Sequence, residues 1–171
     1  ELFGVLEGKV IINRYPTRFD DPDLENGLRS TIERLGAGLL IVDTLGKTLG
    51  ADQSENDNDV ANEITGMLSR LATVTDCTTL MTHHVGHGNS DRARGASGWE
   101  QGLDFSYVIK GTRSDLDAGR PLGLTAHKMR DGRLPPPVGF RLKSLNGLSL
   151  RGPEGGEAMP VTSAVIELAE S

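Results

Sequence analysis

The sequence has 171 residues, which is enough for one domain with its own hydrophobic core. Its net charge is −6, so no global basic field draws it to nucleic acid, and any such contact must come from local patches. A single cysteine excludes a disulfide within the chain, and no apolar run is long enough to span a membrane, so we expect a cytoplasmic protein without membrane association.

The first half of the chain alternates between strand and helix patterns. In chain order we expect a strand at residues 5–13, a helix at 21–35, a strand at 39–42, a polar loop at 44–58, a helix at 59–75 and a strand at 78–82. Residues 39–42 are consecutively apolar, which predicts a strand buried on both faces, as in a parallel sheet. Strands that alternate with helices imply a parallel sheet layered by helices.

The second half begins with a glycine-rich polar loop. The elements expected there are a loop at residues 85–98, a strand at 104–111, a hairpin with strands at 122–130 and 138–144, a Gly- and Pro-rich linker at 148–160, and a helix from 161 to 169. We therefore expect one domain over residues 1–147, followed by a linker and a C-terminal helix over residues 148–171. Ligands of parallel sheets bind at the carboxyl ends of the strands, which is where this pattern directs attention.

The segment LLIVDTLGKTLG, residues 39–50, combines features of two nucleotide-binding motifs. Its glycine-lysine-threonine triplet matches the end of a Walker A loop, G-x-x-x-x-G-K-[ST]. The first glycine of that loop is replaced by Ile41, and a bulky strand cannot curl its amides around a phosphate. We therefore interpret the segment as a Walker B strand that presents Asp43 to Mg²⁺, usually through water. A buried strand that simply ends in a turn Asp is the alternative.

Two histidines follow the next expected strand directly. His83 and His84 stand at the strand end, where polar side chains can touch the terminal phosphate of a nucleotide. His84 can donate a hydrogen bond to an anion in either protonation state. Together with His87 the pair can instead form a metal site, although no cysteine or second carboxylate lies nearby at ligand spacing. A plain surface pair is the third alternative.

Two pairs of cations are candidates for phosphate binding. Arg92 and Arg94 lie in the expected loop, from which they can contact phosphates of a nucleotide or of DNA. Lys128 and Arg130 are two residues apart on an expected strand, so they project from the same face and can clamp a phosphate. The alternatives are a solvated loop for the first pair and an edge-strand charge pair that blocks aggregation for the second.

In their order and spacing, these motifs resemble one family. The segments LLIVDTLGK, TTLMTHH, RARGASGWEQGLDFSYVIKG and LTAHKMRDGR are similar to the RecA-like P-loop ATPase core of RepA- and DnaB-type hexameric replicative helicases. The resemblance implies a RecA-like three-layer α/β/α fold with a mostly parallel sheet and a C-terminal antiparallel hairpin. The family's Walker A loop and catalytic glutamate lie upstream of the Walker B strand, and neither is found here before Asp43. We therefore expect a fragment that is inactive alone.

The resemblance also implies roles for the residues of the strand ends. ATP and Mg²⁺ are the implied cofactors, with Asp43 tuning the metal and Thr44 hydrogen-bonding near metal-bound water. His84, and less directly His83, would sense the γ-phosphate. The loop at residues 85–98 would then couple phosphate loss to the movement of the chain on DNA.

The remaining cations would act on DNA and on a neighbouring subunit. Arg92 and Arg94 lie where RecA-like rings grip single-stranded DNA, and Arg94 can also reach nucleotide. Lys128 and Arg130 would act in trans as an arginine finger, which requires a homo-oligomer, usually a closed hexameric ring. The implied function is the ATPase motor domain of a RepA-like replicative DNA helicase.

Three other functions remain open from the sequence. The chain can be a RecA-like ATPase with a regulatory or recombination role and no unwinding. It can be a degenerate RecA-like module that binds partners without catalysis. It can also be a metal-dependent hydrolase that uses Asp43 and the histidines.

Overall fold

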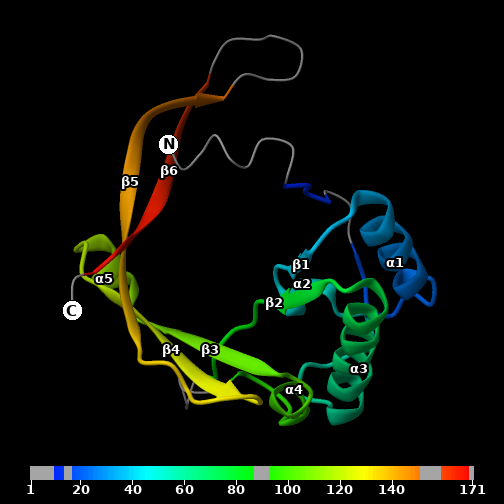
Figure 1. Cartoon of the computed structure of the whole chain (residues 1–171). Coiled ribbons are helices and arrows are strands. Elements are labelled where there is room, and N and C mark those ends of the chain that lie inside the picture. Colours follow the sequence, from blue (N-terminus) through cyan, green and yellow to red (C-terminus); the bar gives the residue numbers. More distant parts are fainter. Residues whose placement is uncertain (1–9, 14–16, 87–92, 151–158, 170–171) are drawn as a thin grey trace. The chain divides into compact units, whose positions relative to one another are not determined.

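The computed structural model of the chain describes residues 10–13, 17–86, 93–150 and 159–169 (Figure 1). The chain divides into two compact units, Glu1–His83 and His84–Ser171, and each unit has its own sheet. Within the described residues, no helix has the length and apolar character needed to cross a bilayer. The cytoplasmic location stays a prediction.

The first unit is built from a parallel pair of strands and two main helices. Its elements are α1 (Leu24–Leu35), β1 (Leu39–Val42), α2 (Leu45–Thr48), α3 (Asn58–Thr75) and β2 (Thr78–Met81). The two strands pair in parallel register, from Leu39 opposite Thr78 to Val42 opposite Met81. This confirms the expected order of strand, helix and strand, with the short α2 as an addition inside the expected polar loop.

Local sequence explains where these helices begin and end. Gly36 follows α1 with φ 60°, a left-handed conformation that favours glycine and ends the helix. Asp57 precedes α3, and its side chain accepts a hydrogen bond from the backbone N of Asp59 at 2.8 Å. Between the helices and the sheet, Ile32 and Leu71 are buried around Cys77.

The strand β1 is covered on one face within its own unit. Leu40 packs against the core between α1 and α3, whereas Leu39 and Ile41 are 51% and 55% exposed. The prediction of a strand buried on both faces is therefore wrong for the described residues of this unit. The physical reason is that both long helices pack on the same side of a two-stranded sheet.

The second unit is an antiparallel sheet with two short helices. Its elements are α4 (Gly98–Gln101), β3 (Phe105–Lys110), α5 (Arg113–Asp117), β4 (Leu122–Met129), β5 (Val138–Leu150) and β6 (Met159–Leu168). The strand order is β3-β4-β5-β6, and every neighbouring pair is antiparallel. This confirms the C-terminal hairpin, whose strands are β4 and β5. The fold class is α/β, as predicted.

The C-terminal segment differs from the prediction. The helix expected from residue 161 to residue 169 is instead β6, which pairs with β5 from Phe140 opposite Leu168 to Leu150 opposite Met159. The segment is rich in β-branched residues, and a free edge of β5 supplies backbone partners that a helix would not use. The expected linker overlaps the ends of β5 and β6, and its residues 151–158 lie outside the described residues.

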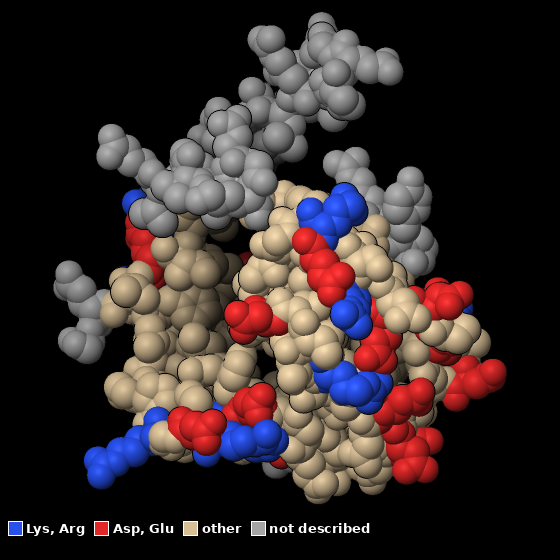
Figure 2. Space-filling model, turned by 45° about the vertical axis from the view of Figure 1, so that its right-hand side comes forward, with Lys and Arg blue, Asp and Glu red and all other residues tan. Residues whose placement is uncertain are grey.

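The N-terminal strand expected at residues 5–13 falls mostly on residues that the structure does not describe. Residues 10–13 are described, and they form neither helix nor strand. On the face shown in Figure 2, basic and acidic side chains are interspersed and not segregated. Among the ion pairs of the first unit, Arg70 Nη2 lies 2.8 Å from Glu25 Oε2 and joins α3 to α1.

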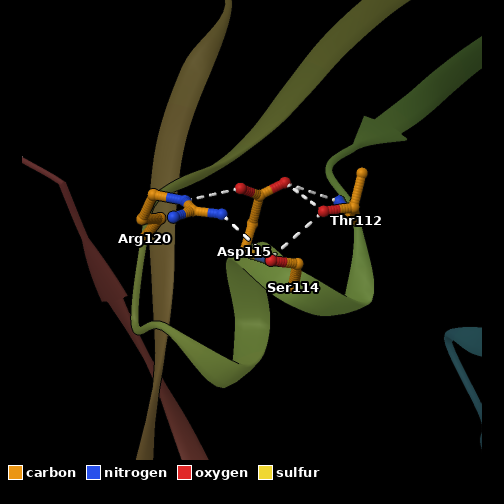
Figure 3. Close-up of polar contacts among 4 residues, drawn as sticks. All are labelled: Thr112, Ser114, Asp115 and Arg120. Carbon is orange, nitrogen blue, oxygen red and sulfur yellow. Dashed lines mark hydrogen bonds and ion pairs between the residues drawn. The ribbon is translucent and has the colours of Figure 1, made fainter.

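The turn between β3 and β4 contains a polar network that the residue pattern did not predict (Figure 3). Thr112 and Asp115 form a capping box at the start of α5, in which each side chain accepts from the other's backbone N. Arg120 Nε donates to the Asp115 carboxylate at 2.7 Å. Hydrogen bonds from Thr112, and then from Arg120, lower the pKa of Asp115 to about 2.

Candidate functional site

Asp43 and Thr82 lie side by side at the carboxyl ends of the two parallel strands. Because Val42 and Met81 are register partners, the residue after each strand continues the pairing. Thr82 Oγ1 donates a hydrogen bond of 2.7 Å to Asp43 Oδ1, and both residues are exposed. The strand end therefore presents an accessible carboxylate, as a Walker B strand requires.

The chain turns sharply after Asp43 and is held by backbone bonds. Thr82 N donates to Val42 O at 2.9 Å, and Leu45 N donates to Thr82 O at 3.1 Å. Leu45 is completely buried, and the peptide between Asp43 and Thr44 is cis. The two backbone bonds and the buried leucine fix the path of the chain on both sides of the carboxylate.

The glycine-lysine-threonine triplet at residues 46–48 forms part of α2. Thr48 Oγ1 donates to Leu45 O at 2.8 Å, which is a bond within the helical turn. The triplet thus follows the strand as a short helix, and the residues before it form β1, not a phosphate-binding loop. This geometry agrees with the Walker B interpretation of the segment.

The two histidines stand on either side of the boundary between the units. His83 is half-buried and directly follows Thr82 at the end of β2. In the second unit, His84 O accepts a hydrogen bond of 2.9 Å from Arg94 N, next to an antiparallel bridge between Val85 and Ala93. The expected contacts of His83 and His84 with phosphate stay predictions.

The bridge places Arg94 at the base of the expected loop, where the residue is half-buried. Arg92 and His87 fall within residues 87–92, outside the described residues. Within the described part of the chain, no three His, Cys, Asp or Glu side chains form a group that could hold a metal ion. The DNA-binding role of the arginines stays a prediction.

The residues at the strand end fit Mg²⁺ better than a zinc ion. Mg²⁺ keeps several waters and binds proteins through one or two carboxylates together with substrate phosphates. Asp43 supplies one exposed carboxylate, and Thr44 next to it carries a hydroxyl group. The donor set lacks the sulfur and imidazole ligands that zinc sites use.

Lys128 and Arg130 have partners within their own unit. Lys128 Nζ donates to the backbone oxygens of Glu100 and Gln101 at 2.6 and 3.2 Å, at the end of α4. Arg130 Nη1 lies 2.6 Å from Asp104 Oδ1, and Arg130 N donates to Asp104 O at 2.7 Å. The two cations therefore join the end of β4 to the segment that links α4 to β3.

The predicted geometry of this cation pair needs one modification. Arg130 lies one residue beyond β4, and the pairing of β3 with β4 shifts so that His127 is an extra residue. This β-bulge changes the direction of the side chains near the strand end. His127 Nε2 lies 3.7 Å from Glu100 Oε1.

Sequence reasoning did not single out Thr82 as a partner of Asp43. A usable signal was present, because both strands have four residues and a polar side chain follows each of them. Once the strands are placed in parallel, equal strand lengths put those two side chains next to each other. Glu100 and Asp104 were noted in the resemblance, but their contacts with β4 depend on the bulge.

Comparisons with known proteins agree with this fold. Residues 9–90 match the AAA domain family. Twelve solved chains are similar to this one, and among them is the ATPase domain of a phage helicase, with a TM-score of 0.54 and 15% sequence identity over 68% of this chain and 47% of that chain.

The chain thus spans about half the length of that solved chain, and at this identity the likeness establishes the fold alone. A comparison with curated proteins gave no match. Residues 9–90 therefore belong to the AAA domain family, and the chain has the α/β fold of a RecA-like P-loop ATPase domain of the helicase type.

Proposed function

We propose that the chain is the part of an ATPase motor domain that begins upstream of the Walker B strand, in a RepA-like replicative DNA helicase. ATP hydrolysis in that protein would drive translocation on single-stranded DNA. The observation that carries the proposal is the position of Asp43, exposed at the end of β1 and hydrogen-bonded to Thr82 at the end of the parallel strand β2. The AAA domain match and the RecA-like fold support it.

Asp43 is the residue that would hold Mg²⁺ through water, with Thr44 hydrogen-bonding beside it. Mg²⁺ bound there would neutralise charge on the phosphates of ATP. His83 and His84 follow the neighbouring strand, and an imidazole N–H from that position is suited to donate to a terminal phosphate oxygen. Loss of that phosphate would then be felt by the segment that starts at Val85.

DNA and neighbouring subunits would engage the second unit. Arg92 and Arg94 are proposed to contact the phosphates of single-stranded DNA, whose binding by such loops is electrostatic and falls with salt. Lys128 and Arg130 are proposed to act on the nucleotide of an adjacent subunit in a hexameric ring. Their present contacts with α4 and Asp104 would place them at the end of β4 for that role.

The test uses the protein expressed from the full open reading frame. We expect ATP hydrolysis that requires Mg²⁺ and is stimulated by single-stranded DNA. Asp43→Asn keeps the oxygen that accepts from Thr82 but removes the charge, so we expect turnover to fall by about a hundredfold or more without loss of folding. Unchanged turnover in this variant would refute the assignment of Asp43.

One observation favours a second candidate, a RecA-like module without unwinding or catalysis. Lys128 and Arg130 are both engaged with backbone or carboxylate oxygens of their own unit, as expected of residues with a purely structural role. Under this alternative the full-length product binds partners but shows no DNA-stimulated ATP turnover. The same turnover assay therefore separates the two functions.

A further inference from the structure

We infer that Thr82 is a positioning residue for the candidate magnesium site, since its hydroxyl fixes the orientation of the Asp43 carboxylate. The inference rests on the proposed function, in which Asp43 is the carboxylate that faces Mg²⁺. Thr82 lies one residue beyond β2 and belongs neither to the Walker B segment nor to the histidine pair at this strand end.

Three hydrogen bonds converge on Thr82. Its backbone N donates to Val42 O, its backbone O accepts from Leu45 N, and its Oγ1 donates to Asp43 Oδ1. One residue therefore contacts the chain before the carboxylate, the carboxylate itself and the chain after it. The backbone bonds set the position of Asp43, and the hydroxyl bond sets the direction of its side chain.

The hydroxyl bond leaves the charge of Asp43 available. Within the described part of the chain, Thr82 supplies the one hydrogen bond that the Asp43 side chain accepts. A neutral donor holds one carboxylate oxygen without compensating the negative charge, whereas a lysine or arginine in its place would compensate it. The other oxygen, Oδ2, is then held in a fixed direction for a cation.

The side chain of Thr82 can be altered without altering its backbone bonds. Both backbone bonds are independent of the side chain, so valine preserves them and nearly preserves the shape of the residue. Thr82→Val removes only the hydroxyl donor, and Thr82→Ser restores it. A difference between these two variants therefore reports on the hydrogen bond to Asp43, not on strand packing.

A matched control lies at the opposite end of the same strand. Thr78 begins β2, is exposed, and pairs with Leu39, at the strand end remote from Asp43. Thr78→Val makes the same chemical change without touching the carboxylate. Any general effect of valine on β2 appears in this control.

The experiment measures binding of a fluorescent, non-hydrolysable ATP analogue to the full-length product as Mg²⁺ is titrated, with ATP turnover as a second readout. Groups that orient a metal ligand typically affect metal affinity or activity by roughly 10- to 100-fold. We expect Thr82→Val to raise the half-saturating Mg²⁺ concentration about tenfold. We expect Thr82→Ser and Thr78→Val to stay near the wild-type value.

The outcomes separate this inference from the proposed function. If Asp43→Asn loses Mg²⁺ dependence while Thr82→Val keeps the wild-type titration, the inference about Thr82 is wrong and the function stands. If the wild-type protein and Asp43→Asn bind and turn over the nucleotide alike, the proposed function fails first. If Thr82→Val lowers the melting temperature without moving the titration, Thr82 has a structural role only. Thr82→Ala carries the same test if the valine variant does not fold.

Discussion

The two candidate regions of this chain are held together by different forces. At the Asp43 end of the first unit, backbone bonds and the completely buried Leu45 fix the turn. At the Arg130 end of the second unit, the side chains of the ion pair with Asp104 are 54% and 69% exposed. A position set by buried contacts and backbone bonds persists when one surface group changes, whereas an exposed ion pair is easily exchanged for another partner. The first region is suited to hold a fixed ligand, and the second to change partners.

The largest effect should come from the core behind the first region. Leu71 is completely buried against Ile32 and Cys77, beneath the face of the sheet that carries Leu40. Leu71→Ala leaves a cavity there, so we expect the free energy of unfolding to fall by about 2–5 kcal/mol. Denaturant unfolding measures this loss.

The control for this prediction is Val74→Ala on the same helix. Val74 is 53% exposed, so its truncation removes little buried surface. The change in stability should then be less than about 1 kcal/mol. Equal effects of the two variants would contradict the position of the core between α1, α3 and β1.

A smaller effect is expected where Lys128 meets α4. Lys128→Met keeps an unbranched side chain but removes the donor to the backbone oxygens of Glu100 and Gln101. Because this contact is only partly buried, we expect the loss in unfolding free energy to be about 1 kcal/mol. Thermal or denaturant unfolding checks the value, and Lys110→Met, the same substitution on β3, is the comparison.

Arg130 should matter still less for stability and more for turnover. The exposed pair with Asp104 is worth about 0–1 kcal/mol, so Arg130→Ala and Asp104→Ala should fold normally. If Arg130 acts on a neighbour's nucleotide, Arg130→Ala in the full-length product loses ATP turnover and keeps nucleotide binding. Wild-type turnover in Arg130→Ala would leave the pair with a structural role only, which would remove the functional half of the comparison.

The difference between the regions also explains how far the sequence could predict them. The apolar run ending at Asp43 and the spacing of leucines in α1 and α3 are short-range patterns, and they placed the strands, the helices and the carboxylate correctly. The exposure of Ile41 was not predictable from the run itself, because burial depends on which faces the helices cover. The strand β6 was mistaken for a helix because its pairing with β5 is a tertiary contact that a local pattern does not reveal.

The site was predictable to the same extent. Asp43 and His83 stand at strand ends that follow from local pattern and parallel pairing. The bond between Thr82 and Asp43 needs the register as well, and the contacts of Lys128 need the bulge at His127. Each further contact required one more piece of long-range geometry than the residue pattern contains.

The smallest expected effect lies in the exposed turn between β3 and β4. The pKa of Asp115 is lowered to about 2 from its usual value of 3.8, with the hydrogen bond from Thr112 as the largest cause and that from Arg120 next. A carboxyl whose pKa is lower in the folded state stabilises that state above the unfolded value, and this contribution is lost as pH falls from about 4 towards 2. The α5 turn should therefore loosen in that range, which amide hydrogen exchange at Thr112 and Asp115 would detect.

Two substitutions make this last prediction specific to Asp115. Asp115→Asn abolishes the titration, so exchange in the turn should become independent of pH between about 4 and 2 after correction for intrinsic rates. Asp117→Asn makes the same change of charge two residues away and should leave the wild-type transition in place. If both variants behave alike, the transition belongs to the net charge of the turn and not to the network of Thr112, Asp115 and Arg120. The exposed contacts of the second unit would then contribute less to its local order than the comparison with the first unit assumes.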